Sequence, residues 1–249
     1  MIIRDEFNLR FGEIERYFTF LEDIEKFDYP QNFQIIDEEL VKILKANGFL
    51  LLYNLIESSV YYSILEIFEE LKYQKIEYQE ISPQLKKFWL KTKFKNVEKQ
   101  THQNIAQKSF TFIEEIINKF PIDLLINKID YGGSITPEII RQFSNEIGLD
   151  FQELSYNDYP NGLALVSIKD KRNELAHGKY SFGQIGKDLS YYGETKLMND
   201  EIKIIKFGLM HYKQFTIEHL SEFIASVETY IPNRQYKNQP LSITANTHP

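Results

Sequence analysis

The chain has 249 residues, enough for one large domain or two small ones, and its composition (43% apolar, 14% aromatic and 26% charged residues) is that of an ordinary globular protein. It contains no cysteine, which excludes a disulfide framework and thiolate catalysis, and it has no apolar stretch of about eighteen residues that could span a membrane. The net charge of −7 argues against a protein that coats nucleic acid non-specifically, although a local phosphate-binding cleft remains compatible with it.

The first two predicted helices are long. From Phe7 onward, apolar residues recur at alternating spacings of four and three, which predicts an amphipathic helix that ends near Pro30. A second helix is expected from Asp37, a suitable N-cap, to about Tyr73. Between residues 49 and 56 this helix is apolar nearly all round, so we expect that section to lie at the centre of the fold.

Two shorter helices follow. Ser82 is a suitable N-cap, and Pro83 then occupies the first helical position, which predicts a helix that runs to about Phe94. Another helix is expected over residues 103–119, because Pro121 would end it.

The middle of the chain contains a strong turn signal. Asp130-Tyr131-Gly132-Gly133-Ser134 is the clearest turn, and Thr136 then opens a short helix that stops near Gly148. We interpret residues 121–158 as an insertion or a small subdomain. Because this helix is short and contains a single arginine, Arg141, we do not expect it to read DNA as half of a helix-turn-helix.

The C-terminal part predicts two helices joined by a connector. The first begins near Asn161 and ends at Gly178, a residue suited to the left-handed position after a helix. Residues 180–189 are expected to form a loop or a single turn. The final helix is predicted from the periodic apolar residues that run from Ile202 to Tyr230.

These patterns together predict an all-α fold, since no stretch shows convincing β alternation. We expect one domain over residues 1–231, which includes the inserted segment, and a flexible polar tail over residues 232–249. Acids near the N-terminus take the place of an apolar signal core, so we expect a cytoplasmic protein with no membrane partner.

The stretch Arg172-Asn173-Glu174-Leu175-Ala176-His177-Gly178 carries the strongest functional signal. A guanidinium holds a phosphate through two parallel hydrogen bonds, and an imidazole moves a proton near neutral pH. In an ideal helix Arg172 and His177 lie about 140° apart, so the pair is poorly placed to act alone. A structural role is the alternative, because helix dipoles favour cations near C-termini and Glu174 could pair with Lys171 or Arg172.

Glu57 is a candidate support for this pair. It shares one face of the second helix with Asn54 and Tyr61, in the most apolar helix of the chain. A buried carboxylate is costly unless it is paired, so we expect Glu57 to meet a cation or a hydrogen-bond donor. The cation could equally be any structural lysine or arginine.

The motif residues resemble the signature of the HEPN superfamily, in which four to six residues separate an arginine from a histidine and the residue directly after the arginine is often polar. Arg172-Asn173 and Ala176-His177 fit this signature. The order of the predicted helices also fits, and the stretches Leu51–Glu57 and Ser181–Gly186 are similar to those of the MAE-type HEPN-like nucleases.

This resemblance implies an all-α, HEPN-like bundle of long antiparallel helices that forms a homodimer and cleaves RNA without a metal or another cofactor. It implies that the ribose 2′-hydroxyl attacks the adjacent phosphorus, with His177 as general base or acid and Arg172 stabilising the charged phosphorane. Asn173 would orient the pair and Glu57 would support it. The implied biological role is a toxin or antiphage effector that an antitoxin or a defence-system protein restrains.

A basic run before residue 100 is the candidate surface for an RNA backbone. It is opposed only by Glu98 and is interleaved with Phe88, Trp89 and Phe94, which could stack on bases. Its members are Lys86, Lys87, Lys91, Lys93, Lys95 and Lys99. A solvated helix face with its aromatic residues in the core is the alternative.

No metal site is expected, because His102, His211, His219 and His248 show no metal-ligand spacing. Two other functions remain open. The chain could be a non-catalytic HEPN-type module that binds RNA, a nucleotide or a protein partner. It could also be a scaffold in which Arg172 and His177 make structural hydrogen bonds.

Overall fold

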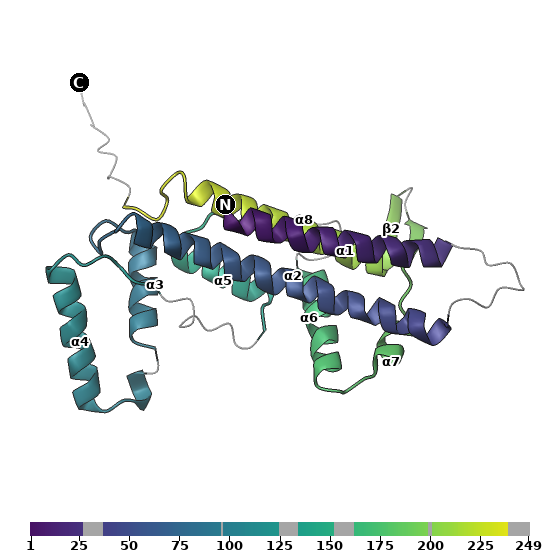
Figure 1. Cartoon of the computed structure of the whole chain (residues 1–249), viewed down its shortest axis with the longest axis horizontal. Coiled ribbons are helices and arrows are strands. Elements are labelled where there is room, and N and C mark those ends of the chain that lie inside the picture. Colours follow the sequence, from purple (N-terminus) through teal and green to yellow (C-terminus); the bar gives the residue numbers. More distant parts are fainter. Residues whose placement is uncertain (27–36, 96, 125–133, 152–161, 199–200, 239–249) are drawn as a thin grey trace, which may run out of the picture. The chain divides into compact units, whose positions relative to one another are not determined.

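The computed structural model describes residues 1–26, 37–95, 97–124, 134–151, 162–198 and 201–238, and the regular elements within these ranges are helices and one hairpin (Figure 1). The chain forms two compact units, each built from several segments. The first comprises Met1–Ser63, Tyr131–Arg141 and Phe151–Ala225, and the second comprises Ile64–Asp130, Gln142–Asp150 and Ser226–Pro249.

The first unit is built on α1 (Ile2–Lys26) and the beginning of α2 (Glu38–Tyr73), which lie side by side and antiparallel (Figure 1). The Tyr17 hydroxyl donates to the Leu44 carbonyl over 2.6 Å, and Lys45 pairs with Glu25 over 2.8 Å. The predicted N-cap of α2 is present, because the Glu39 N–H donates to the Asp37 carboxylate over 2.9 Å.

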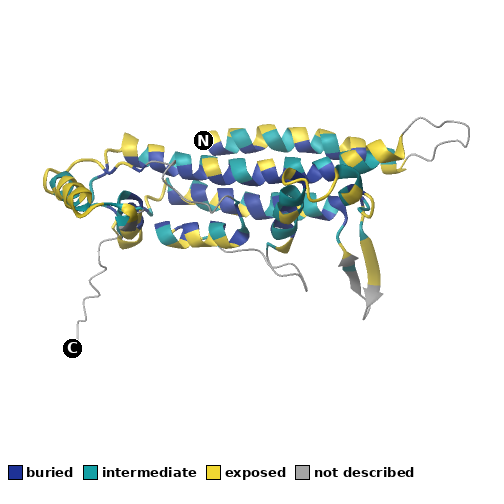
Figure 2. Ribbon diagram, turned by 90° about the horizontal axis from the view of Figure 1, so that it is seen from below, coloured by how far each residue is buried: buried dark blue, intermediate teal, exposed yellow. Residues whose placement is uncertain are grey.

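The core of this unit comes from α1, α2, α6 (Leu163–Ala176) and α8 (Leu209–Tyr230), the last of which continues into the second unit. Buried and exposed faces alternate along the long helices (Figure 2), as the three–four spacing predicts. The buried side chains include Phe7, Ile14, Phe18 and Leu21 of α1, Phe49, Leu52, Leu55 and Ile56 of α2, Leu165 and Ile168 of α6, and Leu220 and Phe223 of α8. The expected central section of α2 is therefore confirmed.

A two-stranded antiparallel hairpin precedes α8, and the sequence analysis did not predict it. It pairs β1 (Glu194–Met198) with β2 (Glu201–Lys206). The periodic apolar series of the last helix was predicted from Ile202, but α8 begins at Leu209. Ile202 and Ile205 of β2 match the helical spacing by chance, and β-branched residues favour a strand.

The base of the hairpin depends on two glycines. Gly193 has a φ of +74°, and a Cβ there would lie 2.4 Å from the Gly208 nitrogen. A Cβ on Gly208 would lie 2.1 Å from the Gly193 nitrogen. Backbone contact this close leaves no room for a side chain, so the chain turns into α8 at this point.

The second unit contains α3 (Pro83–Lys93), η1 (Val97–Lys99), α4 (His102–Ile117) and the last part of α5 (Pro137–Ile147). Ser82 caps α3 as predicted, since its hydroxyl accepts from the Leu85 N–H over 3.3 Å. Phe88 and Trp89 of α3 are buried, and the indole N–H of Trp89 donates to the Asp123 carbonyl over 3.2 Å.

The tail expected from residue 232 onward is described as far as residue 238, and it makes contacts at Tyr236 and Lys237. The Ser82 N–H donates to the Tyr236 carbonyl over 2.8 Å, Tyr236 is fully buried, and Lys237 pairs with Glu80 over 3.0 Å. Tyr236 is thus a buried aromatic anchor in an otherwise polar sequence. Residues 239–249 lie outside the described residues.

The expected turn over residues 130–134 lies outside the described residues except for Ser134, and only parts of the segment 121–158 are described. No helix of the described ranges combines the length and the apolar character that crossing a membrane requires.

Candidate functional site

The Arg/His motif lies on α6, which packs through Ala164, Leu165, Ile168 and Leu175. The helix begins after Gly162, whose φ is +83°. A Cβ at Gly162 would lie 2.3 Å from the side chain of Pro137, the first residue of α5. This contact sets the start of α6 against the start of α5, ten residues before Arg172.

The end of α6 is a complete Schellman motif. Gly178, with a φ of +65°, donates its N–H to the Leu175 carbonyl over 3.1 Å, and Lys179 donates to the Glu174 carbonyl over 3.0 Å. The prediction that Gly178 takes the left-handed position is confirmed. Because backbone groups satisfy these carbonyls, the cap needs no side chain, and His177 at the C-cap position is exposed.

Arg172 is held by three different contacts. One terminal nitrogen donates to the Asn173 side-chain oxygen over 2.8 Å, and the other donates to the Glu57 carboxylate over 3.3 Å. The guanidinium carbon lies 4.3 Å from the centre of the Tyr53 ring. These contacts leave three of the five guanidinium N–H groups without a partner among the described residues.

Tyr53 is the site residue that the sequence analysis missed. It is 2% exposed, and its hydroxyl accepts from the Ile135 N–H over 3.0 Å. Burial raises the pKa of this hydroxyl above its ordinary value, so it remains a neutral phenol. Its position four residues before Glu57 on α2 is the sequence signal that could have identified it, since residues at that spacing share a helix face.

Glu57 meets a cation, as expected, and the cation is Arg172. The carboxylate is nevertheless not buried, because its side chain is 42% exposed and its neighbours on this face, Asn54 and Tyr61, are exposed too. The expectation of a buried Glu57 is wrong because the apolar residues of α2 leave this one face open. Glu174 pairs with Lys171 over 2.9 Å instead of with Arg172.

The structure therefore brings together Glu57, Asn173 and Arg172 with Tyr53, and it leaves His177 apart. No hydrogen bond or ion pair joins the imidazole to Arg172 in the described part of the chain. The roles of these residues stay predictions. Chemically, the arrangement offers an oriented guanidinium for an anion and, separately, a solvent-exposed imidazole.

Comparison with protein families identifies the fold. The family described as HEPN_MAE_28990-like HEPN matches residues 2–236, nearly the whole chain. The protein belongs to this HEPN family. No curated protein and no solved structure matches the chain.

HEPN domains are in general ribonucleases or nucleotide-related modules, and they commonly bind RNA and dimerise. In this HEPN domain the residues that match the superfamily signature are those at the end of α6. The family match thus agrees with the resemblance read from Arg172-Asn173 and His177, and with the all-α fold.

The lysines of the predicted RNA surface lie on and just after α3, in the second unit of the HEPN domain. Lys91 pairs with Glu146 over 2.6 Å, Lys93 pairs with Glu115 over 2.8 Å, and Lys86 lies 5.1 Å above the Tyr78 ring. Lys87 is exposed, and Lys95 is half-buried.

The aromatic residues of this run are mostly unavailable for stacking on bases. Phe88 and Trp89 are buried, so the alternative interpretation, in which they belong to the core, holds for these two. Phe94 is half-buried and keeps part of its ring at the surface.

The sequence predicted no metal site at the other histidines. In the described ranges no three histidine, aspartate or glutamate side chains gather into a possible metal site. His211 and His219 are buried, His102 is exposed, and His248 lies outside the described residues. Burial, and then the charge of Arg141, lower the pKa of His219 to about 4.

Proposed function

We propose that this HEPN domain is a metal-independent endoribonuclease whose active site combines Arg172, Asn173, His177 and Glu57 from two copies of the chain. The observation that carries the proposal is the state of Arg172. Its guanidinium is oriented by Glu57, Asn173 and Tyr53 before any ligand binds, and it retains N–H groups for a phosphate.

The chemistry follows from the groups available. His177 as general base takes the proton of a ribose 2′-hydroxyl, and the 2′-oxygen forms a bond to the adjacent phosphorus. The bond from phosphorus to the 5′-oxygen breaks, and a second proton goes to the leaving oxygen from an imidazolium. The products are a 2′,3′-cyclic phosphate and a 5′-hydroxyl. Arg172 stabilises the phosphorane, in which the charge on the non-bridging oxygens is largest.

Two copies of the chain supply what one copy lacks. The reaction needs one base and one acid, and a symmetric dimer would bring a neutral imidazole and an imidazolium to one phosphate. The exposure of His177 at the end of α6 supports this arrangement, because an exposed side chain is available to a partner's Arg172. A symmetric interface around α6 would also bring Asn173 of each copy to the shared site.

The biological role that fits such a nuclease is a cytoplasmic toxin or antiphage effector, restrained by an antitoxin or another defence-system protein. The lysines Lys86, Lys87, Lys91, Lys93 and Lys95 would contact the RNA backbone. In this proposal residues 1–231 act as one domain.

Cleavage of single-stranded RNA in the presence of EDTA tests the proposal. Wild type should cleave, while His177→Ala and Arg172→Ala should each lose about a hundredfold or more in rate. His102→Ala is the matched control, because His102 is an exposed histidine outside the site, and it should cleave like wild type. Equal cleavage by all variants would refute the assignment, and RNA binding without cleavage would favour the non-catalytic module.

Mixing wild type with His177→Ala tests whether the site is shared. If both imidazoles act on one phosphate, a mixed dimer lacks one of them, and random mixing in equal amounts leaves about a quarter of the wild-type activity. If each copy works alone, about half remains. Sedimentation of the same mixture establishes whether dimers form.

A further inference from the structure

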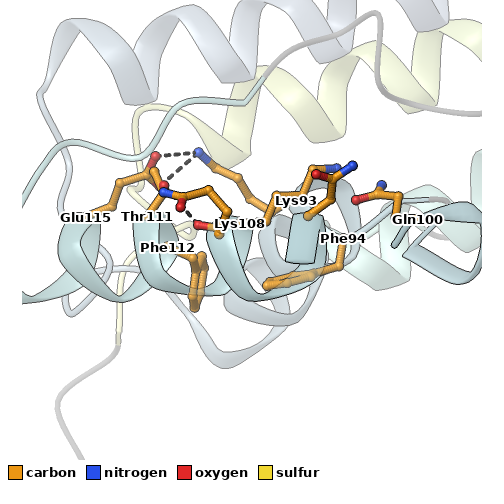
Figure 3. A pocket seen from close by; sticks show the side chains of 9 residues that line it. Lys93, Phe94, Gln100, Lys108, Thr111, Phe112 and Glu115 are labelled. Atoms are coloured by element: carbon orange, nitrogen blue, oxygen red, sulfur yellow. Dashed lines mark hydrogen bonds and ion pairs between the residues drawn. The ribbon is translucent and has the colours of Figure 1, made fainter. Parts of the chain in front are cut away.

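A pocket of about 500 Å³ lies in the second unit, between α4 and the chain that leads from α3 through η1 (Figure 3). Its volume falls within the range of about 300–1,000 Å³ that is usual for small-molecule sites. One wall is a stripe of α4 side chains at helical spacing, which includes Asn104, Gln107, Lys108 and Thr111. The site proposed for RNA cleavage uses none of these residues.

The chemistry of the lining is unusual for a solvated helix face. Three primary amides line the pocket, those of Gln100, Asn104 and Gln107, and each offers both a donor and an acceptor. Two aromatic rings, Phe94 and Phe112, also line it and lie together below the polar groups in Figure 3. Their centres are 5.6 Å apart with the planes 70° from parallel, so one presents an edge to the other.

The charges in the pocket leave a positive balance. Lys93 donates to both carboxylate oxygens of Glu115, over 3.0 and 2.8 Å, so these two charges compensate each other. Lys108 is exposed and has no ion pair within the described part of the chain. A ligand that contacts Lys108 would therefore carry a negative charge, next to the polar groups that meet the amides.

Gln100 adds a hydrogen-bonding group that is not satisfied. Its side-chain oxygen is buried and has no hydrogen-bond partner among the described residues. An unpaired buried acceptor is destabilising, and a donor that enters the pocket removes that cost after a small rotation of the amide.

We propose that this pocket binds an unpaired nucleobase, with the amides on the base edge, Phe94 and Phe112 against its apolar surface, and Lys108 on the adjoining phosphate. Asparagine and glutamine amides match the donor–acceptor edges of bases, and aromatic rings stack on them. A purely apolar ligand would leave three amides unpaired. The choice of RNA as the source of the base rests on the proposed function, and a free nucleotide is the other source.

Binding assays on the full chain carry the test, in a His177→Ala background so that the probe is not cut. The probes are octanucleotides of A, C or U, an abasic octanucleotide, and the free nucleotides AMP, CMP and UMP. Fluorescence anisotropy measures the oligonucleotides and calorimetry measures the nucleotides. Binding of a base-bearing octanucleotide should be about tenfold tighter than that of the abasic one, as expected for one stacked and hydrogen-bonded base.

Two matched pairs of variants locate the binding. Gln107→Ala should weaken binding about threefold to tenfold, the effect of one hydrogen-bonding side chain. Gln103→Ala should leave it unchanged, because Gln103 is exposed on the same helix but does not line the pocket. Lys108→Gln should weaken binding of charged probes more than Lys119→Gln, which removes a cation just after α4.

Each outcome supports or overturns the nucleobase site. Binding of free nucleotides that depends on Gln107 and Lys108 supports the pocket with a mononucleotide as its ligand, and binding of octanucleotides alone supports RNA. Equal affinity for the abasic probe, equal effects of Gln103→Ala and Gln107→Ala, or no binding by any probe overturns the proposal. If the pocket binds a base while the wild-type chain cleaves no RNA, the nuclease proposal fails and the pocket stands. If Gln107→Ala cleaves RNA normally and binds it as tightly as the chain with Gln107, the pocket proposal fails and the nuclease proposal stands.

Discussion

Two substitutions of Tyr53 separate its two contacts. Its ring faces the Arg172 guanidinium at 4.3 Å, while its hydroxyl accepts the Ile135 N–H at 3.0 Å. Tyr53→Phe keeps the ring and removes the acceptor. Tyr53→Leu removes both, so only this second variant should loosen Arg172.

The expected magnitudes follow from burial. Ile135 is 6% exposed, so its unpaired N–H in Tyr53→Phe should lower the free energy of unfolding by about 1–3 kcal/mol. The Arg172 side chain is 27% exposed, so its cation–π contact with the Tyr53 ring is intermediate between an exposed and a desolvated one. Such a contact stabilises the guanidinium by about 1–2 kcal/mol. If that energy holds the guanidinium in its reactive position, Tyr53→Leu should lower kcat about fivefold to thirtyfold.

The assay is RNA cleavage by each variant well below its unfolding transition, with urea unfolding measured in parallel. The control pair is Tyr61→Phe and Tyr61→Leu, two turns later on α2, where the side chain is 43% exposed. Both control variants should cleave like wild type. The reasoning is refuted if Tyr53→Phe loses as much kcat as Tyr53→Leu, or if Tyr53→Leu changes stability alone.

Three further outcomes are expected. Arg172→Lys keeps the charge but loses the planar, forked donor, so cleavage should fall about a hundredfold, and near-normal cleavage would contradict the role of bidentate binding. The pKa of His219 falls from 6.5 to about 4 on folding, so the unfolded chain takes up a proton first as pH falls. Wild type should therefore lose about 2 kcal/mol of unfolding free energy between pH 7.5 and 5, whereas His219→Leu should not show this loss. Urea titrations of both proteins at the two pH values measure the difference. A Cβ at Gly186 would lie 2.0 Å from the Lys42 carbonyl oxygen, so Gly186→Ala should lower the free energy of unfolding by about 1–3 kcal/mol. Gly12→Ala, with no atom within 4 Å of the new Cβ, should be neutral or stabilising. Equal unfolding midpoints for the two variants would contradict this expectation.

Local signals in the sequence predicted the helix ends well. Asp37, Ser82 and Gly178 act through groups within a few residues of themselves, so the residue type determines the cap wherever the helix lies. The same locality explains why the helices themselves were largely predictable. Their apolar spacing is a property of the segment alone.

Long-range contacts were not predictable in this way. Tyr53 contacts Ile135, eighty-two positions later, and the spacing of Tyr53 from Glu57 gives no information about that contact. The hairpin at Glu194–Lys206 depends on backbone contact between Gly193 and Gly208, which no periodicity reports. The pairing of Glu57 was predictable in kind, but its partner and its exposure depend on which face of α2 remains open.

The short segment between α6 and α7 (Phe182–Gly186) joins two anchored points. On one side, Arg172 contacts Glu57 of α2; on the other, Gly186 meets the backbone of Lys42 on the same helix. The residues between, 177–181, are exposed, and their backbone is closed by the Schellman motif and the capping box of Ser181. The side chains of Lys179 and Tyr180 can therefore diverge among descendants of this protein with little loss of stability, and the surface beside His177 is free to acquire new partners while the helices beneath it stay unchanged.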